Sequence, residues 1–517
     1  MKHANLEQLT TEELRALTTQ LMSQVVQLEG QVSTKEKQNL NLKTLNDKLT
    51  HEIAILRRHK YGRTSESLNV LQISLLDDVV EADIAGIEEE LAGMDQSLPQ
   101  RKRKQQPKRT PLPPEFPRKV INHEPDNTQC ACGCQLKRIG EDVSEKLDYT
   151  PGVFTVEHHV RGKWACADCE SITQAPVPAQ VIDKGIPTSG LLAQVLIAKY
   201  ADHLPLYRQE KIFERAGLSI ARSTLADWVG RCGVTLQPLV DAMRDNLLTE
   251  PILHADETPV PMLSPGKKKT HRAYIWAYAN TVDADRPMVI YDFTETRAGK
   301  HARTFLGEWR GKMVCDDFGG YKAGFAGGIT EIGCMAHARR KFYELHERKK
   351  SLIAEQALAI IARLYKVERV IQDMDVQQRL HHRKEYAKPI LDELHHWLIS
   401  HRQKVLEGTA IAKVIDYSLN RWSALTRYCE DGAVPIDNNW AENQIRPWAL
   451  GRKNWLFAGS LRSGQRAAAV MSLIQSAKIN DIEPYAYLKD VLDRLPTTKA
   501  SQIDELLPYN WKLAVNL

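Results

Sequence analysis

Three carboxylates stand at positions that suit a site for divalent metal ions. Asp256 ends the apolar run PILHAD, and Asp316 ends the run KMVCD. Glu442 follows Asp437 and Asn438, either of which can cap a helix that carries Glu442 in its first turns. Magnesium prefers oxygen ligands, and two such ions about 3.5 to 4 Å apart activate a nucleophile and stabilise the leaving oxygen at a phosphodiester. The three side chains therefore predict a phosphoryl-transfer site that binds two Mg²⁺ or Mn²⁺ ions.

Two neighbouring acids, Asp317 and Glu257, compete with this choice. Side chains alternate between the two faces of a strand, so Asp316 and Asp317 point to opposite faces, and Glu257 faces away from Asp256. We prefer Asp316, which shares a strand face with Val314. Taken singly, each acid also suits a turn, a helix cap or a surface charge, so the assignment depends on context.

Basic residues follow these acids and the pair Cys334 and His337. They are Arg339, Arg340, Lys341, Arg446, Arg452 and Lys453. We expect them to contact DNA phosphates near the scissile bond. An ion pair between Arg446 and Glu442, four residues apart on one helix, is an alternative. Cys334 and His337 are too few ligands for a metal site and are expected to be a buried pair.

Five of the nine cysteines fall between residues 130 and 169. They are Cys130, Cys132, Cys134, Cys166 and Cys169. Cys166 and Cys169 have the C-x-x-C spacing that closes two corners of a tetrahedral zinc site, whereas spacing does not select the other pair. The cluster predicts one structural Zn²⁺ held by four of the five thiolates. The alternative is a set of unrelated free thiols.

The charge is nearly balanced overall, with 70 Lys and Arg against 65 Asp and Glu, but it is unevenly distributed. Residues 101–119 carry eight basic side chains and one acid, and residues 443–480 carry six basic side chains and no acid. Both stretches suit phosphate contact. The acidic residues 77–90 are expected either to shield the basic stretch until DNA displaces them or to be disordered.

A membrane location is not expected. No apolar run approaches the roughly 20 residues that span a bilayer, and the sequence begins without the apolar core of a signal peptide. These features predict a soluble, intracellular protein of the cytoplasm that has no membrane partner.

A leucine heptad runs from residue 14 to residue 56, broken once at Lys35. Its seam is formed by Leu14, Leu21, Leu28, Leu42, Leu49 and Leu56, with Thr18, Val25, Val32, Asn39, Asn46 and Ile53 between them. Such a seam needs a partner helix to bury it, and seam asparagines favour a fixed register and a low oligomer number. The sequence predicts a coiled-coil dimer. The alternative is an amphipathic helix packed on its own domain.

Four segments carry a resemblance to a known family: HADETP, VCDDFGGY, CMAHARRKF and IDNNWAENQIRPWALGRKNWLFAGS. They resemble the landmarks of the insertion sequence sixty-six transposase family of the TnpC type, and the resemblance extends over the whole chain. It implies a ribonuclease H-like core whose two Asp and one Glu correspond to Asp256, Asp316 and Glu442. Asp317 stands where the family usually has Gly. The first cysteine pair is compressed, which makes Cys134 a substitute zinc ligand.

The expected fold is therefore a multidomain α+β chain. The predicted parts are a leucine-zipper coiled coil (8–62), an acidic then basic Pro-rich linker (63–119), a zinc-binding module (120–183), a helical segment with a possible helix-turn-helix (184–248), the first part of a ribonuclease H-like core (249–341), an α-helical insertion (342–432), the final part of the core with Glu442 (433–475) and a C-terminal helical tail (476–517).

The resemblance implies a DDE transposase that cuts and joins DNA strands at the ends of an insertion sequence in the bacterial nucleoid. The implied partners are double-stranded DNA, as transposon ends and target, a second copy of the chain or a higher oligomer, and companion proteins from the same element. Two other functions stay open. One is a catalytically silent, zinc-containing dimeric DNA-binding regulator, and the other is a metal-dependent nuclease without strand transfer.

Overall fold

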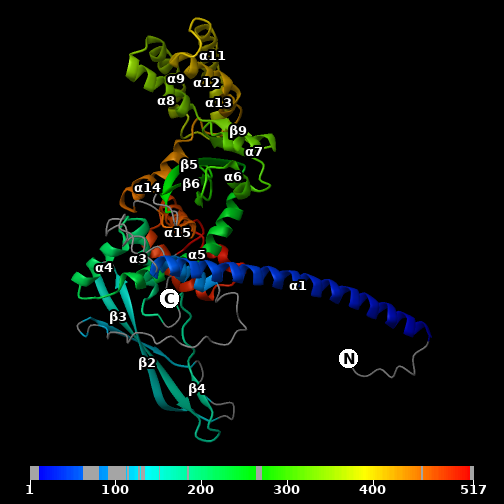
Figure 1. The fold of residues 1–517 in the computed structure, drawn as a ribbon, viewed down its shortest axis with the longest axis vertical. Helices are drawn as coiled ribbons and strands as arrows, with labels where there is room; N and C mark the ends of the chain where they lie inside the picture. The colour runs from blue at the N-terminus through cyan, green and yellow to red at the C-terminus, as the bar shows by residue number, and fades with distance from the viewer. Residues whose placement is uncertain are drawn as a thin grey trace. The chain divides into compact units, whose positions relative to one another are not determined.

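The computed structural model describes residues 11–61, 81–90, 112, 114, 116–125, 128–129, 134–150, 152–182, 185–263, 270–455 and 458–512 (Figure 1). The chain divides into two compact units. The first comprises residues 1–65 and 87–106, and the second comprises residues 66–86 and 107–517.

The first unit is dominated by one long helix, α1 (Thr11–Tyr61). Three residues of the predicted seam, Leu28, Val32 and Leu42, are 57%, 54% and 46% exposed in the single chain, whereas the later seam residues Leu49, Ile53 and Leu56 are buried. A 51-residue helix with apolar seam residues in solvent suits the predicted zipper. The pairing of two such helices stays a prediction.

A short helix covers residues 81–90, inside the segment expected to be a linker. In its part that belongs to the second unit, Ala82, Asp83 and Ala85 are buried. Asp83 forms an ion pair with Arg466 of α15 (Leu461–Ile479), with 2.6 Å between Oδ1 and Nη2. The acidic composition obscured this helix because the small apolar residues between the acids are the ones that pack.

A long β-hairpin carries the cysteine segment. The strands of its sheet are β1 (Arg118–His123), β2 (Lys137–Thr150), β3 (Val153–Ala165) and β4 (Ile172–Gln174). Strands β2 and β3 are antiparallel, β1 is parallel to β3, and β4 pairs with the end of β3. Lys137 pairs with Ala165, so Cys134 and Cys166 lie at the same end of the hairpin. At the other end, Leu147 is fully buried in the main core.

Three helices follow the hairpin: α3 (Ser189–Tyr200), α4 (Leu206–Arg215) and α5 (Arg222–Leu247). Helix α5 is buried along most of its length and packs against α15. Its Gly233 leaves no room for a Cβ, which would lie 2.0 Å from the side chain of Arg466. The segment therefore serves as packing for the core. A groove-reading helix-turn-helix stays a prediction.

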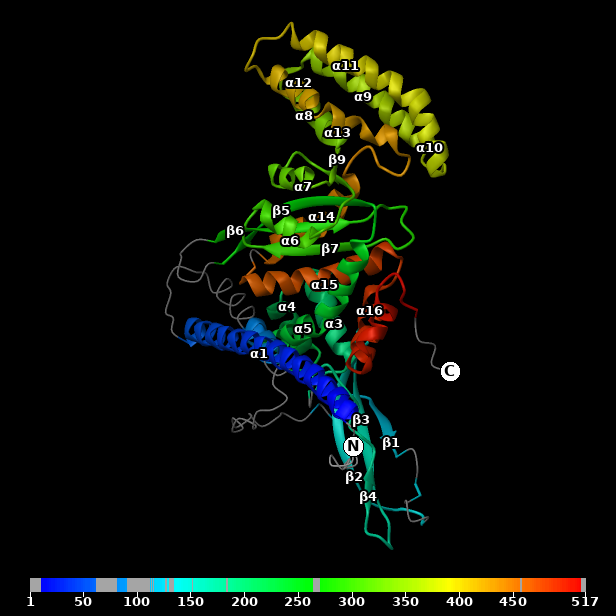
Figure 2. The ribbon, with the colours of Figure 1, turned by 90° about the vertical axis from the view of Figure 1, so that its right-hand side faces the viewer.

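A five-stranded sheet forms the centre of the second unit (Figure 2). Its strands are β5 (Ile252–Met262), β6 (His271–Ala279), β7 (Val289–Thr294), β8 (Lys312–Cys315) and β9 (Thr330–Gly333). Two of them, β5 and β8, coincide with the apolar runs PILHAD and KMVCD. The spatial order is β7-β6-β5-β8-β9, with β5, β6 and β7 antiparallel and β5, β8 and β9 parallel.

Helices surround this sheet. Helix α15 packs along β7, and α14 (Asn439–Trp455) packs against β5 and β6. The connections between the strands contain α6 (Gly299–Leu306), the 3₁₀ turn η2 (Gly319–Tyr321) and α7 (Lys322–Ala326). The chain continues to α16 (Pro484–Arg494), η5 (Leu495–Thr497) and η6 (Ala500–Leu506). No helix in the described ranges is long and apolar enough to cross a membrane.

A helical insertion with its own hydrophobic core lies between β9 and α14. It comprises α8 (Met335–Lys349), α9 (Leu352–Val370), α10 (Val376–His382), the π-helical turn η3 (Arg383–Ala387), α11 (Lys388–Arg402), α12 (Ala410–Asn420), α13 (Trp422–Thr426) and η4 (Arg427–Glu430). Arg383 is buried, pairs with Glu368 at 2.7 Å and donates to three main-chain carbonyls of residues 428–434. This pair closes the base of the insertion.

Candidate functional site

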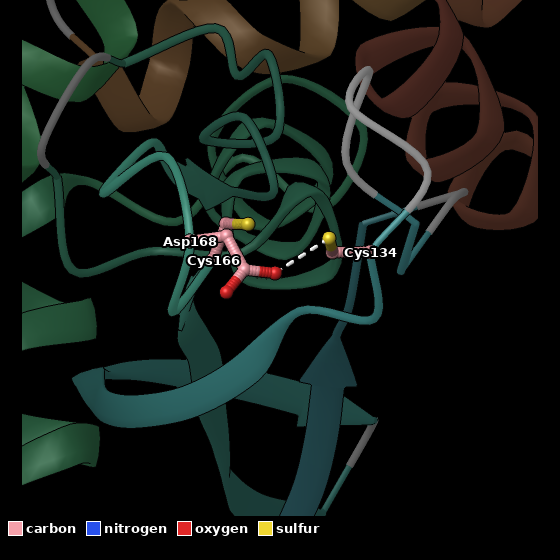
Figure 3. A group of neighbouring side chains, drawn as sticks. All are labelled: Cys134, Cys166 and Asp168. Atoms are coloured by element: carbon pink, nitrogen blue, oxygen red, sulfur yellow. Dashed lines mark hydrogen bonds between the residues drawn. The ribbon is translucent and has the colours of Figure 1, made fainter.

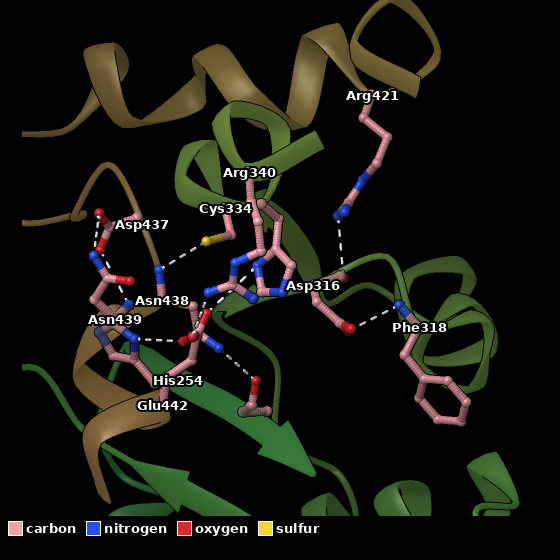
Figure 4. A network of polar contacts seen from close by, with 12 residues as sticks. His254, Asp316, Phe318, Cys334, Arg340, Arg421, Asp437, Asn438, Asn439 and Glu442 are labelled. Atoms are coloured by element: carbon pink, nitrogen blue, oxygen red, sulfur yellow. Dashed lines mark hydrogen bonds and ion pairs between the residues drawn. The ribbon is translucent and has the colours of Figure 1, made fainter. Parts of the chain in front are cut away.

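Asp256, Asp316 and Glu442 come together at one edge of the central sheet. Figure 4 shows Asp316 and Glu442 there. His254 of β5 pairs with Val314 of the parallel strand β8, so Asp256 and Asp316 stand at the same level, each two residues further along. Glu442 lies in the first turn of α14, which packs against β5. The parallel pairing therefore puts Asp256, in the middle of β5, beside Asp316, directly after β8, and the helix that follows the insertion adds the third acid.

The three carboxylates crowd one another. The pKa of Asp256 is raised to about 8, first by burial and then by the negative charges of Glu257, Glu442 and Asp316. Such a cluster is costly when ionised unless a cation sits within it. One oxygen of Glu442, Oε1, is buried and has no hydrogen-bond partner among the described residues. Crowded carboxylates and an unsatisfied oxygen are what a divalent cation needs, so the residues present fit such an ion.

The structure distinguishes Asp316 from Asp317. Asp316 accepts a hydrogen bond from the main-chain N–H of Phe318 at 2.9 Å, which orients its carboxylate beside Asp256. The carboxylate of Asp317 lies 3.6 Å from Nε of Arg421 in the helical insertion and is 44% exposed. Asp317 is therefore directed to an arginine, and Asp316 is directed to the carboxylate cluster.

Glu257 occupies the opposite face of β5, as strand alternation predicts. It forms an ion pair with Arg297 and accepts a hydrogen bond from the hydroxyl of Tyr321 at 3.0 Å. The side chain is 1% exposed, and burial and the charge of Asp316 raise its pKa although these partners act in the opposite direction. Glu257 therefore affects the cluster through its negative charge, which raises the pKa of Asp256.

Glu442 is held by two residues of α8 that sequence reasoning did not connect to it. Nη2 of Arg340 lies 3.1 Å from Oε2 of Glu442, and Nδ1 of His337 lies 3.6 Å from Oε1. The sulfur of Cys334 is also close, since the three groups Cys334, His337 and Glu442 lie within 4.8 Å of one another. Cys334 and His337 were expected to be a buried pair, but only Cys334 is buried, His337 is partly exposed, and the fold adds Glu442 to them. Burial raises the pKa of the Cys334 thiol to about 12 and keeps it neutral.

Asn438 joins the strand of Asp256 to the helix of Glu442. Its side chain is fully buried, accepts from Nδ1 of His254 at 2.8 Å and donates to the carbonyl of Ala255 at 2.9 Å. Its own carbonyl accepts from the N–H of Glu442 at 3.1 Å. Burial lowers the pKa of His254 to about 4, so the ring stays neutral. A histidine inside the apolar run ILHA was the signal that this strand position has a polar partner.

The neighbouring acid, Asp437, lies two residues before the first residue of α14 and binds local partners there, while its role as the helix cap stays a prediction. Asp437 accepts a hydrogen bond from the N–H of Asn439 at 3.0 Å and another from the hydroxyl of Tyr365 at 2.9 Å. It is therefore occupied at the start of α14, as its position in the sequence indicates.

The basic residues expected to bind DNA fall into two groups. On α8, Arg339 and Arg340 are exposed, and Nζ of Lys341 lies 4.4 Å from the ring of Tyr417. On α14, Arg446 is exposed and forms no ion pair with any described residue, and Arg452 donates to the carbonyl of Pro259 at 3.0 Å. The side chain of Lys453 lies outside the described part. Arg340 from α8 takes the place beside Glu442 that the helical spacing offered to Arg446.

The cysteine cluster is partly described (Figure 3). Cys134, Cys166 and Asp168 have their ligand atoms within 4.8 Å of one another, and the Cys134 thiol donates to Asp168 at 2.6 Å. The sulfur of Cys169 lies 3.1 Å from the hydroxyl of Ser171. Cys130 and Cys132 lie outside the described residues. Two soft sulfur ligands and a carboxylate at one end of the hairpin suit Zn²⁺.

Four family models match the chain. Residues 184–466 match the model described as Transposase IS66 family, and residues 472–509 match the IS66 C-terminal element. Residues 127–170 match the zinc-finger binding domain of transposase IS66. Residues 48–121 match the model described as Transposase C of IS166 homeodomain.

Relatives of similar length occur in Sinorhizobium fredii. The uncharacterized protein y4jD is 35% identical over 488 residues, which cover 90% of this chain and 94% of the relative. The uncharacterized protein y4hP is 35% identical over 484 residues, which cover 89% and 87%. The uncharacterized protein y4qI is 35% identical over 491 residues, which cover 90% and 89%.

Proposed function

The chain belongs to the IS66 family of transposases, and from that premise we propose that it cuts and joins DNA strands at the ends of an insertion sequence. The observation that carries the proposal is the convergence of Asp256, Asp316 and Glu442 at one sheet edge. We assign these three side chains as the catalytic carboxylates and as ligands of two Mg²⁺ or Mn²⁺ ions.

The core that presents them is, in this proposal, ribonuclease H-like. The order β7-β6-β5-β8-β9 supports it, since three antiparallel strands are followed by two parallel ones. The first acid stands on the first strand of the sheet, the second follows the fourth, and the third stands on a helix after the insertion. This arrangement agrees with the roles that the family resemblance implies.

The protein's own residues set the geometry of the reaction. When bound, two divalent ions lower the pKa of an attacking water or 3′-hydroxyl and stabilise the leaving oxygen. Asp256 and Asp316 hold their positions through parallel strands, and Asn438 fixes the helix of Glu442 against the same strand. Arg340 orients Oε2 of Glu442 through a hydrogen bond, while Oε1 lies 3.6 Å from Nδ1 of His337 without a hydrogen bond. One site can serve both steps because cleavage and joining are the same in-line displacement with different nucleophiles.

The remaining parts bind DNA and a second copy of the chain. We assign Arg339, Arg340, Lys341, Arg446, Arg452 and Lys453 to phosphates of the transposon end and target. The zinc module, with one structural Zn²⁺, holds in shape the end of the β2–β3 hairpin opposite its turn, and α1 pairs with α1 of another copy. Companion proteins from the same element act with this chain in the full reaction.

The deciding experiment uses the full-length protein with a duplex that contains the element's own end. In Mg²⁺, we expect nicking at the end and joining of the freed 3′-hydroxyl to a second duplex. Asp256→Asn, Asp316→Asn and Glu442→Gln should each abolish both products and keep binding of the end. Binding without any nicking by the unchanged protein would make it a silent regulator. Nicking without joining would make it a nuclease.

A further inference from the structure

A groove of about 710 Å³ lies between α8 and α9 beside the carboxylate cluster. Its lining includes Arg339, Arg340, Tyr343, Tyr365, Arg369 and Asn439. Arg340 connects it to the site, because this side chain both lines the groove and contacts Glu442 at 3.1 Å. We call it the α8–α9 groove.

The groove is positively charged at the end near Glu442. Helices α8 and α9 form a hairpin joined by two residues, so the C-terminal end of α9 returns to the beginning of α8 (Figure 2). Arg339 and Arg340 of α8 and Arg369 near the end of α9 line the same groove. The acidic lining residues, Glu344 and Glu347, lie further along α8, away from the carboxylate cluster.

Two of these arginines are available to a ligand. Arg339 and Arg369 are exposed, and neither forms an ion pair with another residue in the described ranges. On the same helix α9, Arg363 pairs with Glu393 at 2.7 Å, outside the groove. Exposed guanidinium groups without a carboxylate partner suit phosphate oxygens, which they bind through two parallel hydrogen bonds.

The groove also presents an aromatic face. Tyr343 is 45% exposed, and the guanidinium of Arg339 lies 6.0 Å from the centre of its ring. Tyr365 is fixed by its hydroxyl, which donates to Asp437. Arginines beside an exposed tyrosine form the kind of surface on which single-stranded bases stack while their phosphates are bound.

We propose that the α8–α9 groove holds unpaired nucleotides of the DNA strand that continues past the scissile phosphate. Arg339 and Arg369 bind its phosphates, and Tyr343 stacks on a base. A base-paired strand has its base faces covered by its neighbours, so only an unpaired base offers a face to Tyr343. The proposal rests on the proposed function, because it takes the carboxylate cluster as the point of cleavage.

The test measures binding, in an Asp256→Asn background that blocks cleavage. The probe is a forked duplex whose unpaired strand contains 2-aminopurine, compared with the same duplex fully paired. Stacking on Tyr343 should quench the probe. Tyr343→Ala should abolish the quenching and weaken binding of the fork roughly 5- to 100-fold, whereas Tyr343→Phe should keep both.

The arginines are tested with matched controls. Arg339→Ala combined with Arg369→Ala should weaken binding of the fork far more than binding of the paired duplex. Arg363→Ala on the same helix and Tyr386→Ala, an exposed tyrosine at η3, should change neither. Equal losses for both duplexes would reduce the groove to a general phosphate surface, and unchanged quenching in Tyr343→Ala would overturn the stacking.

Failure of this inference is separable from failure of the proposed function. Quenching is read without cleavage, so it can be present in a protein that cuts nothing. Conversely, the Tyr343→Ala variant could nick and join its ends normally and bind the fork as before. That result would support the proposed function and contradict the role of the groove.

Discussion

The Nδ1 atom of His254 on β5 lies 2.8 Å from Oδ1 of Asn438 at the start of α14. This fully buried contact ties the strand that carries Asp256 to the helix that carries Glu442. One amide and one imidazole thereby hold together the two elements that carry Asp256 and Glu442, the acids proposed as catalytic, which are widely separated in sequence.

Asn438→Ala should lower strand cleavage about 100-fold, because a displacement of about 1 Å is enough for such a loss. It should also raise the Mg²⁺ concentration needed for half-maximal rate, since Glu442 is displaced. Binding of the end should persist, and stability should fall by about 1 to 3 kcal/mol because His254 loses its partner. Asn439→Ala is the control. An unchanged metal dependence would limit Asn438 to a structural role.

Asp316→Asn and Asp317→Asn should have clearly different activities in a cleavage assay. Asp317 lies against Arg421 and is 44% exposed, so its neutralisation should leave most of the activity. Asp316 lies in the carboxylate cluster, so its neutralisation should remove activity. Soaking Mn²⁺ into crystals of the protein should give density beside Asp316. The reverse pattern of activity would transfer the assignment to Asp317.

Leu28→Lys combined with Val32→Lys should convert the oligomer to a monomer. Both side chains are more than half exposed in the single chain, and a charge in the seam opposes burial against a partner helix. Met22→Lys is the matched control, because Met22 is 67% exposed but stands off the seam. Sedimentation equilibrium gives the mass. A doubly substituted protein that still sediments as an oligomer would place the interface elsewhere.

The purified protein should contain one zinc ion per chain. Cys134→Ser, Cys166→Ser and Cys169→Ser should each lose it, because a tetrahedral site seldom survives with three ligands. Of Cys130→Ser and Cys132→Ser, only one should do so, which identifies the fourth ligand. Elemental analysis measures the metal. Retention of zinc by Cys166→Ser would contradict the site.

Asp292→Asn should stabilise the protein near neutral pH. Burial raises the pKa of Asp292 to about 6, from an ordinary value of 3.8, despite the charge of Arg244. Stability from this raised carboxyl is complete below about pH 4 and is lost as the pH rises to about 6. Asparagine avoids that loss, which amounts to roughly 2 to 3 kcal/mol. Thermal unfolding at about pH 5 and pH 7 should show a difference that grows with pH.

The strands were predictable because apolar runs bounded by turn residues report local burial directly. Asp256 could be proposed from the sequence because it ends such a run. Glu442 could be proposed because it follows residues that suit a helix cap. The role of Asp317 was also accessible from strand alternation.

The contacts around Glu442 were not predictable in this way. Arg446 stands at the right helical spacing, yet Arg340 from α8 takes the carboxylate, because the packing of two helices decides it. The sequence indicated Asn438 only as a possible helix cap. Its actual partners, His254 and Ala255, lie on a strand far earlier in the sequence. Long-range contacts of this kind leave no local pattern.

The buried pair of Asp83 and Arg466 bears on where the chain can be cut for expression. The two residues are 383 positions apart, and the family model that contains Arg466 begins at residue 184. A fragment designed on that boundary would keep the arginine in the core and discard its carboxylate. Removing one partner of a buried ion pair lowers the free energy of unfolding by about 3 to 5 kcal/mol. A soluble catalytic fragment therefore has to include the short helix at residues 81–86, either in the same chain or supplied as a separate peptide.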